Sequence, residues 1–457
     1  MALRIIGQVP GPPPFAITGR GAGDIADAIE AGIVDGALPA GHPLPTVRNL
    51  AAELGTSTAT VAAAYRRLGE RGLVRGNGRA GTVVRPRRPR SARRVALALP
   101  PDVVDLSSGN PDPALLPDLR PALAAAADAL NGTDGRSALY GHGGNAAELV
   151  SALRRRLDAD HAPPGEPLVV GGSLDGIGRA LATSTRPGDR VLVEDPAYCG
   201  LLDLLDALDL RPHPVAADDR GARADAVAES LTVRPAAAVF SPRGHNPTGA
   251  ARTAERRDEL AAVLSAAPGL LVIDDDHLGP GADRPLHPLA GTTTRWAYVY
   301  GTSKSLGPDL RVAALLADPI TRHRVLGHQQ ASAGWVSLLL QHAVHALLVD
   351  PATDALLDRA RETYRARRDA LLDALRRRGH SASATSGYNV WLPVPHEATT
   401  SQALQNEGWA VRPGEAFRLV SPPAVRITTA TLATPQADLL ADAVDRAIAG
   451  TGRGRSA

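Results

Sequence analysis

Short apolar runs alternate with helical stretches through most of this chain, from about residue 102 onward. The runs PLVVGG, RVLVED, AAVFSP, LLVIDDD and AYVYGT recur with helical segments between them. Apolar runs alternating with helices are typical of a mostly parallel α/β sheet. Beyond residue 355 the pattern changes to a helix, the strands WLPVP and VRITTA and a final helix, which predicts a smaller α/β C-terminal lobe.

The first 84 residues predict three helices and a β-hairpin. Ile25 and Ile29 lie at helical spacing in GAGDIADAIEAGIVDG, and TVRNLAAELG reads as a short helix ended by Gly55. Ser57 is the expected N-cap of STATVAAAYRRLGERG, and LVRGNGRAGTVV has the glycine-rich turn of a hairpin wing. We therefore expect a winged helix-turn-helix over 1–84, a Pro- and Arg-rich linker over 85–101 and an α/β domain over 102–457.

Charge divides the chain in the same way. Residues 1 to 100 hold 14 arginines against 6 acidic residues, a net charge of +8, whereas the whole chain carries only +2. A basic module joined to a larger acidic part suggests nucleic-acid binding. A single cysteine, Cys199, argues against an internal disulfide framework, and no apolar run approaches the ~18 residues of a membrane helix, so we expect a cytoplasmic protein.

The third helix is the candidate for reading DNA. A helix that enters the major groove from its N-terminal end needs short hydrogen-bonding side chains there. The sequence offers Thr56, Ser57, Thr58 and Thr60 at that end. Arg48 at the head of the preceding helix, and Arg75 and Arg79 in the wing, are placed to reach phosphates or a groove edge.

The run PLPTVRNLAAELGTSTATVAAAYRRLGERGLV resembles the winged helix-turn-helix of GntR-family bacterial regulators. The resemblance covers about 65 residues and implies a DNA-binding domain. The family often has arginine after the serine, where this chain has Thr58, so base readout there is open. A winged helix that docks a protein is the alternative interpretation.

Lys304 is the only lysine in the chain, so that 49 of the 50 basic residues are arginines. Lysine can form a Schiff base with an aldehyde, whereas the guanidinium of arginine cannot. A pyridoxal phosphate site needs such a lysine, an acid facing the pyridine nitrogen, a donor near the phenolic oxygen, an aromatic ring over the cofactor and a phosphate cup.

Each of these parts has a candidate at the end of a predicted strand. Asp275 can pair with the pyridinium, Asn246 can donate to the phenolic oxygen, and Tyr198 can stack on the ring. The phosphate cup would consist of Gly172, Ser173 and Arg311. The alternatives are a solvated turn for the aspartates, core packing for Tyr198 and an ordinary tight turn for Gly172-Ser173.

The ordered motifs SSGNPDP, LYGHGG, GGS, EDPAY, HNPTG, DDDH, TSK…R and AVRITTA resemble fold type I pyridoxal phosphate aminotransferases over roughly residues 102–450. The resemblance implies a homodimer in which Tyr140 reaches the phosphate of the neighbouring subunit. It also implies that Arg426 takes the α-carboxylate of an amino-acid ligand. A structural ion pair is the alternative for Arg426.

Two positions depart from the aminotransferase pattern. His277 stands where the family usually has a tyrosine, and can still donate to the phenolic oxygen with a different pKa and reach. Gly301 stands where a hydroxyl ligand of the phosphate is often found, and Thr302 and Ser303 are expected to compensate.

The two resemblances together identify the MocR subgroup of GntR regulators. They imply a transcription regulator that binds pyridoxal phosphate as an aldimine on Lys304 and responds to the cofactor or to an amino-compound effector. A working aminotransferase with an accessory winged helix, and a constitutive DNA-binding protein that has lost the cofactor, remain as alternatives. No metal site is expected, because His342 and His345 have no carboxylate or cysteine residue nearby in the sequence that could complete a set of ligands.

Overall fold

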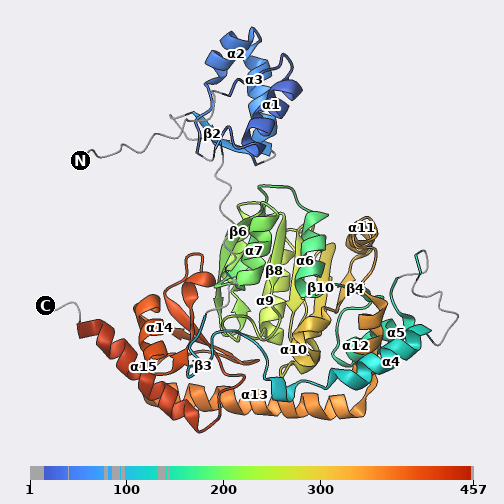
Figure 1. Cartoon of the computed structure of the whole chain (residues 1–457), viewed down its shortest axis with the longest axis vertical. Coiled ribbons are helices and arrows are strands. Elements are labelled where there is room, and N and C mark those ends of the chain that lie inside the picture. Colours follow the sequence, from blue (N-terminus) through green and yellow to red (C-terminus); the bar gives the residue numbers. More distant parts are fainter. Residues whose placement is uncertain are drawn as a thin grey trace, which may run out of the picture. The chain divides into compact units, whose positions relative to one another are not determined.

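The computed structural model describes residues 15–39, 41–70, 72–76, 81–84, 93, 98–131, 139–140 and 144–453. It divides into two compact units, Met1–Ser91 and Ala92–Ala457. Figure 1 shows the elements of each unit. The predicted linker lies across this division, and of its residues only Arg93 and 98–101 are described.

The N-terminal unit is a winged helix-turn-helix, as predicted. It contains α1 (Ala22–Val34), α2 (Val47–Leu54), α3 (Thr58–Glu70) and the antiparallel strands β1 (Val74–Gly76) and β2 (Thr82–Val84). Gly55 ends α2 in the left-handed conformation, with φ of 62°, which glycine adopts without steric cost. Ser57 Oγ accepts a hydrogen bond from the Thr60 amide at 3.1 Å and so caps α3. Ile25 and Ile29 are buried in the core between the helices.

The larger unit is built on an eight-stranded sheet in the order β4-β11-β10-β9-β8-β5-β6-β7. The bounds are β4 (Leu168–Val170), β5 (Arg190–Asp195), β6 (Arg211–Asp218), β7 (Gly221–Ala222), β8 (Ala237–Phe240), β9 (Leu271–Asp276), β10 (Arg295–Gly301) and β11 (Ala313–Ala317). The central run from β10 to β6 is parallel, while β11 and β7 pair antiparallel with their neighbours. The prediction of a mostly parallel sheet is therefore confirmed.

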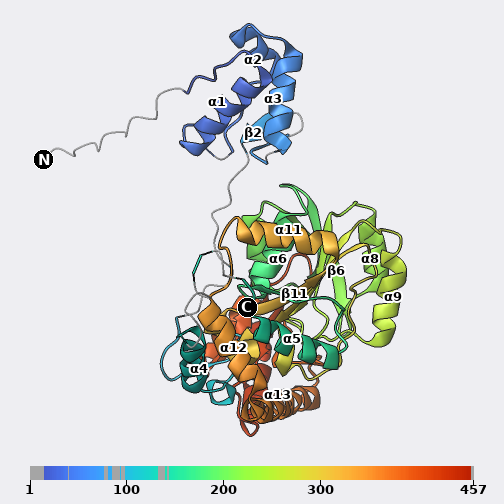
Figure 2. The ribbon, with the colours of Figure 1, turned by 90° about the vertical axis from the view of Figure 1, so that its right-hand side faces the viewer.

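Helices cover both faces of this sheet because its strands are apolar on both sides. The face formed by alternate strand residues such as Val193, Ile273 and Val299 packs against α6 (Ser173–Ala182), α7 (Cys199–Ala207) and α11 (Pro319–Gln330). The opposite face packs against α8 (Ala224–Leu231) and α9 (Ala254–Leu264) near β6, and against α4 (Leu119–Asn131), α5 (Ala147–Ala159) and α12 (Leu338–Val349) near β4. In Figure 2, the pair α6 and α11 is separate from the pair α5 and α12, which covers the opposite face of the sheet.

The C-terminal part forms the predicted smaller lobe. Its sheet has the order β12-β15-β14, with β12 (Asn389–Pro393), β14 (Arg412–Pro413) and β15 (Ala424–Thr428). Helices α14 (Glu397–Asn406) and α15 (Gln436–Arg453) belong to it, and the long α13 (Pro351–Arg377) runs beneath both lobes (Figure 1). Strand β3 (Val104–Asp105), which follows the linker, pairs in parallel with β13 (Trp409–Ala410). Within the described residues, no helix is both long and apolar enough to cross a bilayer.

Candidate functional site

The predicted cofactor residues gather at one edge of the large sheet. Strands β5, β8, β9 and β10 are parallel, and β4 runs in the same direction because two antiparallel pairings separate it from β10. Their carboxyl ends therefore share an edge, where open α/β sheets bind ligands. The carboxyl ends of these strands and the segments that follow them carry Gly172, Ser173, Tyr198, Asn246, Asp275, His277, Thr302, Ser303 and Lys304.

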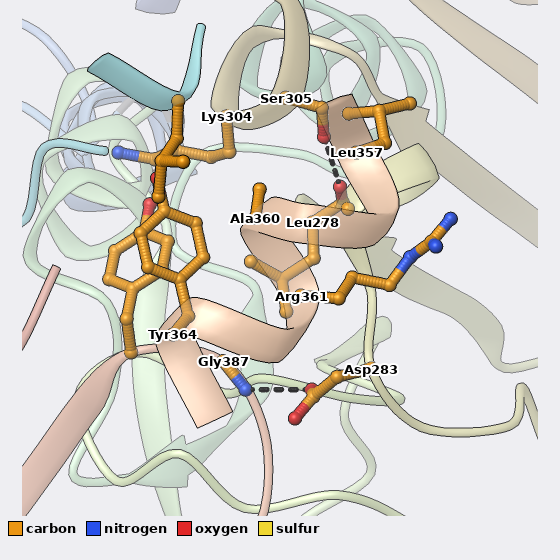
Figure 3. A pocket seen from close by; sticks show the side chains of 12 residues that line it. Leu278, Asp283, Lys304, Ser305, Leu357, Ala360, Arg361, Tyr364 and Gly387 are labelled. Carbon is orange, nitrogen blue, oxygen red and sulfur yellow. Dashed lines mark hydrogen bonds between the residues drawn. The ribbon is translucent and has the colours of Figure 1, made fainter. Parts of the chain in front are cut away.

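Lys304 lies in the short helix α10 (Ser303–Leu306), and its Nζ donates a hydrogen bond to the Gly109 carbonyl at 2.7 Å. Figure 3 shows the amino group directed away from Ser305, Ala360 and Arg361, which line a small cavity along the lysine stem. Burial, and the nearby charges of Arg426 and Arg311, lower the pKa of Lys304 to about 8. A larger fraction of the amine is therefore neutral and nucleophilic near neutral pH.

The three aspartates of the β9 end are buried and have different surroundings. Asp274 forms an ion pair with Arg252 at 2.9 Å, and Asp276 forms one with Arg243 at 2.7 Å. Asp275 Oδ1 has no hydrogen-bond partner although it is buried. Burial first, and then its acidic neighbours, raise the pKa of Asp275 to about 7. A solvated turn is excluded, and the carboxylate would be satisfied by a cationic N–H such as a protonated pyridine nitrogen.

The predicted phosphate cup is compact. Gly172 precedes α6 with φ of 97°, and a Cβ there would lie 2.7 Å from Arg311 Nη2. Arg311 itself has a left-handed backbone, with φ of 49°. Ser173 is the first residue of α6, where free backbone amides and the helix dipole favour an anion. The space that a side chain at 172 would fill, lined by a guanidinium and a helix terminus, fits a phosphate group.

A side chain at Gly301, such as the hydroxyl that the aminotransferase pattern suggests, would displace the Ser173 hydroxyl. A Cβ at this position would lie 2.6 Å from Ser173 Oγ and 3.1 Å from the His277 carbonyl oxygen. The expectation that Thr302 compensates stays a prediction, and the surroundings of its side chain count against it. Thr302 is fully buried and its hydroxyl donates to the Val312 carbonyl at 2.7 Å, so the donor is used by the backbone. Ser303, half-buried at the start of α10, stays a prediction.

Arg426 is buried on β15 without an acidic partner among the described residues. Its Nη1 donates to Asn246 Oδ1 at 3.0 Å, its Nη2 donates to the Ser107 carbonyl, and its guanidinium lies 4.9 Å from the centre of the Phe417 ring. Nε has no partner, and burial lowers the pKa of Arg426 to about 10. An uncompensated buried guanidinium is costly, and a carboxylate ligand would relieve that cost. A structural ion pair of Arg426, the alternative interpretation, is not observed in the part of the chain that the structure describes.

Three further residues were expected to contact the cofactor, namely Tyr198, His277 and Tyr140. Tyr198 occupies the N-cap position of α7 and is half-buried beside Phe417. Burial, and then Lys304, lower the pKa of His277 to about 4, so this imidazole is neutral where the family has a phenol. Tyr140 is 93% exposed with its ring 5.9 Å from that of Trp335, and does not contribute to the site of its own chain.

Sequence reasoning missed Tyr388, which lies directly before β12. Its hydroxyl is buried without a partner, and its ring lies 5.0 Å from that of Tyr364. Burial raises the pKa of Tyr388 well above its usual range, so the O–H donor is retained. Both tyrosines line the same small cavity as Lys304. The sequence carries no signal for Tyr388 because its place in this cavity depends on packing against Tyr364, which lies on α13.

The predicted DNA-reading residues differ in availability. Thr58 and Arg48 are exposed. Ser57 and Thr60 hydrogen-bond each other at 2.8 Å, and Thr56 donates to the Arg20 carbonyl at 3.2 Å. Of these four hydroxyl groups, the one of Thr58 is therefore the one for which no hydrogen bond within the chain is described. The side chain of Arg75 and the whole of Arg79 lie outside the described residues.

Comparisons with known proteins agree with this two-part organisation. Residues 22–84 match the family described as bacterial regulatory proteins, gntR family, and residues 101–444 match aminotransferase class I and II. The vitamin B6 salvage pathway transcriptional repressor PtsJ of Salmonella typhimurium is 37% identical over 94% of this chain and 99% of its own length. The HTH-type pyridoxine biosynthesis transcriptional regulator PdxR of Corynebacterium glutamicum is 29% identical over 75% of this chain and 76% of its own.

Solved structures with the fold of the larger unit include the α-aminoadipate aminotransferase LysN of Thermus thermophilus. That structure, complexed with N-(5'-phosphopyridoxyl)-L-leucine, has a TM-score of 0.66 and 25% identity over 77% of this chain and 93% of its own. The multiple substrate aminotransferase of Thermococcus profundus shares the fold, with a TM-score of 0.68 and 22% identity over 78% of this chain and 93% of its own. The predictions of a fold type I aminotransferase domain and of pyridoxal 5'-phosphate as its cofactor are confirmed.

Proposed function

Because the chain belongs to the MocR-type GntR regulators, which join a winged helix to an aminotransferase class I and II domain, we propose that it is a cytoplasmic transcription regulator whose DNA binding responds to pyridoxal 5'-phosphate or to an amino-compound effector. Two relatives named for vitamin B6 salvage and pyridoxine biosynthesis suggest genes of vitamin B6 supply as its targets.

The cofactor, when bound, supplies an aldehyde that condenses with a primary amine and a ring that withdraws electrons. Lys304 would supply that amine, and Asp275 would hold a proton on the pyridine nitrogen. Gly172 and Arg311 would surround the phosphate, and Asn246 would face the phenolic oxygen. Arg426 would orient the carboxylate of an effector, so that an amino acid is recognised at both its charged ends.

The observation that carries the proposal is the buried, unpartnered Oδ1 of Asp275. A chain of this fold that had lost its cofactor would have little reason to keep an uncompensated carboxylate between two aspartates that are already paired. This argues against the constitutive DNA-binding alternative.

The enzymatic alternative is favoured by one observation, the simultaneous presence of Lys304, Asp275, Asn246 and Arg426 in one site. Against it stands His277, a neutral imidazole in place of the usual phenol. Steady turnover of an amino donor and a keto acid, abolished by Lys304→Ala, would establish transaminase activity.

We also propose a homodimer. The exposed side chains of Leu123, Leu139, Tyr140 and Leu339 present apolar surface on and near α4 and α12. A second copy covering this surface would bring Tyr140 to the partner's phosphate cup, and a dimer would set the spacing of two DNA half-sites. Sedimentation of the purified protein should therefore give twice the mass of one chain, and a monomer at micromolar concentration would contradict this part.

The cofactor proposal is tested by incubating the protein with pyridoxal 5'-phosphate, reducing with borohydride and mapping the modified peptide by mass spectrometry. The label should fall on Lys304 and be absent from Lys304→Arg, which keeps the positive charge but not the nucleophile. Labelling only at the N-terminal amine would overturn the proposal.

A further inference from the structure

The acidic edge of α7 holds a residue of the linker that leads to the DNA-binding unit. The Arg93 amide donates to Asp203 Oδ1 at 3.0 Å, and the Arg93 guanidinium donates to Asp206 Oδ2 at 3.0 Å. The guanidinium also lies 3.7 Å from Asp203 Oδ1. Asp203 and Asp206 lie one turn apart on the same face of α7, so they form a two-carboxylate seat for an arginine.

Arg93 is also hydrogen-bonded to the small lobe. Arg412 on β14 donates through Nη2 to the Arg93 carbonyl. Arg93 is therefore bonded to α7 of the large lobe and to β14 of the small lobe at once. Any change in the distance between the two lobes must stretch or break one set of these bonds.

Each anchor is linked through secondary structure to a residue of the proposed ligand site. The α7 helix that carries the two aspartates has Tyr198, the candidate for stacking on the cofactor ring, as its N-cap residue. On the small lobe, Arg412 is paired across the sheet with Arg426, the candidate for an effector carboxylate. Contacts made by a ligand with Tyr198 or Arg426 therefore act on the two elements that hold Arg93.

The chain beyond Arg93 is tied to the site a second time. Strand β3 pairs with β13 of the small lobe, and the following carbonyls of Ser107 and Gly109 accept hydrogen bonds from Arg426 and Lys304. Condensation of an aldehyde with Lys304 Nζ forms a C=N bond and releases water. The nitrogen then has fewer N–H groups to donate to the Gly109 carbonyl. A carboxylate on Arg426 would likewise compete with the Ser107 carbonyl.

We propose that Asp203, Asp206 and Arg412 form a docking surface for the arginine-rich linker of this chain, and that Arg93 seated on it couples occupancy of the Lys304 site to DNA binding. This inference rests on the proposed function. The partner is the linker itself, because the surface offers two carboxylates for a guanidinium and a guanidinium for a backbone carbonyl.

The test compares coupling ratios, measured with pyridoxal 5'-phosphate as the probe and an operator fragment selected from random-sequence DNA by the purified full-length protein. The ratio is the DNA Kd without the probe divided by the Kd with it. A ratio that departs from 1 by about 5- to 150-fold is expected for the wild type. Arg93→Ala and Asp206→Asn should bring the ratio within about 2-fold of 1 while the affinity for pyridoxal 5'-phosphate, which involves neither side chain, is unchanged.

Two controls separate this from a general loss of charge or of fold. Asp209→Asn removes one exposed carboxylate just beyond α7 and should keep the wild-type ratio. Arg93→Asp should abolish coupling, and Arg93→Asp with Asp206→Arg should restore part of it, which a merely structural defect would not do. If the wild type couples and Arg93→Ala and Asp206→Asn couple equally well, the docking surface is refuted while the proposed function stands. If the wild type shows no coupling, both are refuted.

Discussion

Placing a side chain at Gly301 should weaken cofactor binding, although the aminotransferase pattern suggests a hydroxyl there. The Cβ of Gly301→Ala would lie 2.6 Å from Ser173 Oγ, and 3.1 and 3.2 Å from the carbonyl oxygen and the Cα of His277. The cheapest relief is rotation of the Ser173 hydroxyl away from the phosphate cup. A hydrogen bond to a charged group is worth about 1.5–3 kcal/mol, so the Kd for pyridoxal 5'-phosphate should rise roughly ten- to a hundredfold.

A double-mutant cycle isolates this effect. Gly301→Ala is measured by absorbance titration with pyridoxal 5'-phosphate in the wild type and in Ser173→Ala, which lacks the hydroxyl that would be displaced. The penalty should be large in the first background and small in the second, and apo melting temperatures identify variants that lose the fold. Equal penalties in both backgrounds, or tighter binding by Gly301→Ser, would refute the reasoning.

Further predictions concern the charges of the site. Attachment of pyridoxal 5'-phosphate to Lys304 should accelerate from pH 6 to a plateau above about 8 in stopped-flow absorbance, and Arg426→Gln, which removes a neighbouring positive charge, should move that rise to higher pH. Asp275→Asn should raise the melting temperature of the apo protein more at pH 8 than at pH 5.5, because the cost of the raised pKa grows from the ordinary value of 3.8 up to about 7; an equal change at both pH values would contradict this. Arg243→Ala leaves Asp276 buried without its guanidinium and should lower the unfolding free energy in urea by about 3–5 kcal/mol, so an unchanged urea midpoint would be evidence against this role.

The elements that could be predicted from the sequence are those fixed by local signals. The caps of α2 and α3 at Gly55 and Ser57, and the apolar runs of β5, β8 and β9, act within a few residues of their own position. Asp275 and Lys304 were placed together because strand ends of a parallel sheet must share an edge.

Features that depend on contacts between distant segments could not be predicted. Strand β6 was missed because its polar residues, in RPHPVAAD, suit a partly exposed strand near the sheet edge. The inward turn of the Thr302 hydroxyl depends on the Val312 carbonyl, and the crowding at Gly301 depends on Ser173. The hydrogen bonds of Arg93 join the linker to residues more than a hundred positions away.

The most direct test of the central claim is the operator Kd of the wild type and of Lys304→Ala, each measured by fluorescence anisotropy with and without pyridoxal 5'-phosphate. A regulator that senses the cofactor through Lys304 should change its Kd by about 5- to 150-fold in the wild type and by no more than about 2-fold in Lys304→Ala. Equal Kd values for all four samples would contradict the account and leave the larger unit as a scaffold for the winged helix.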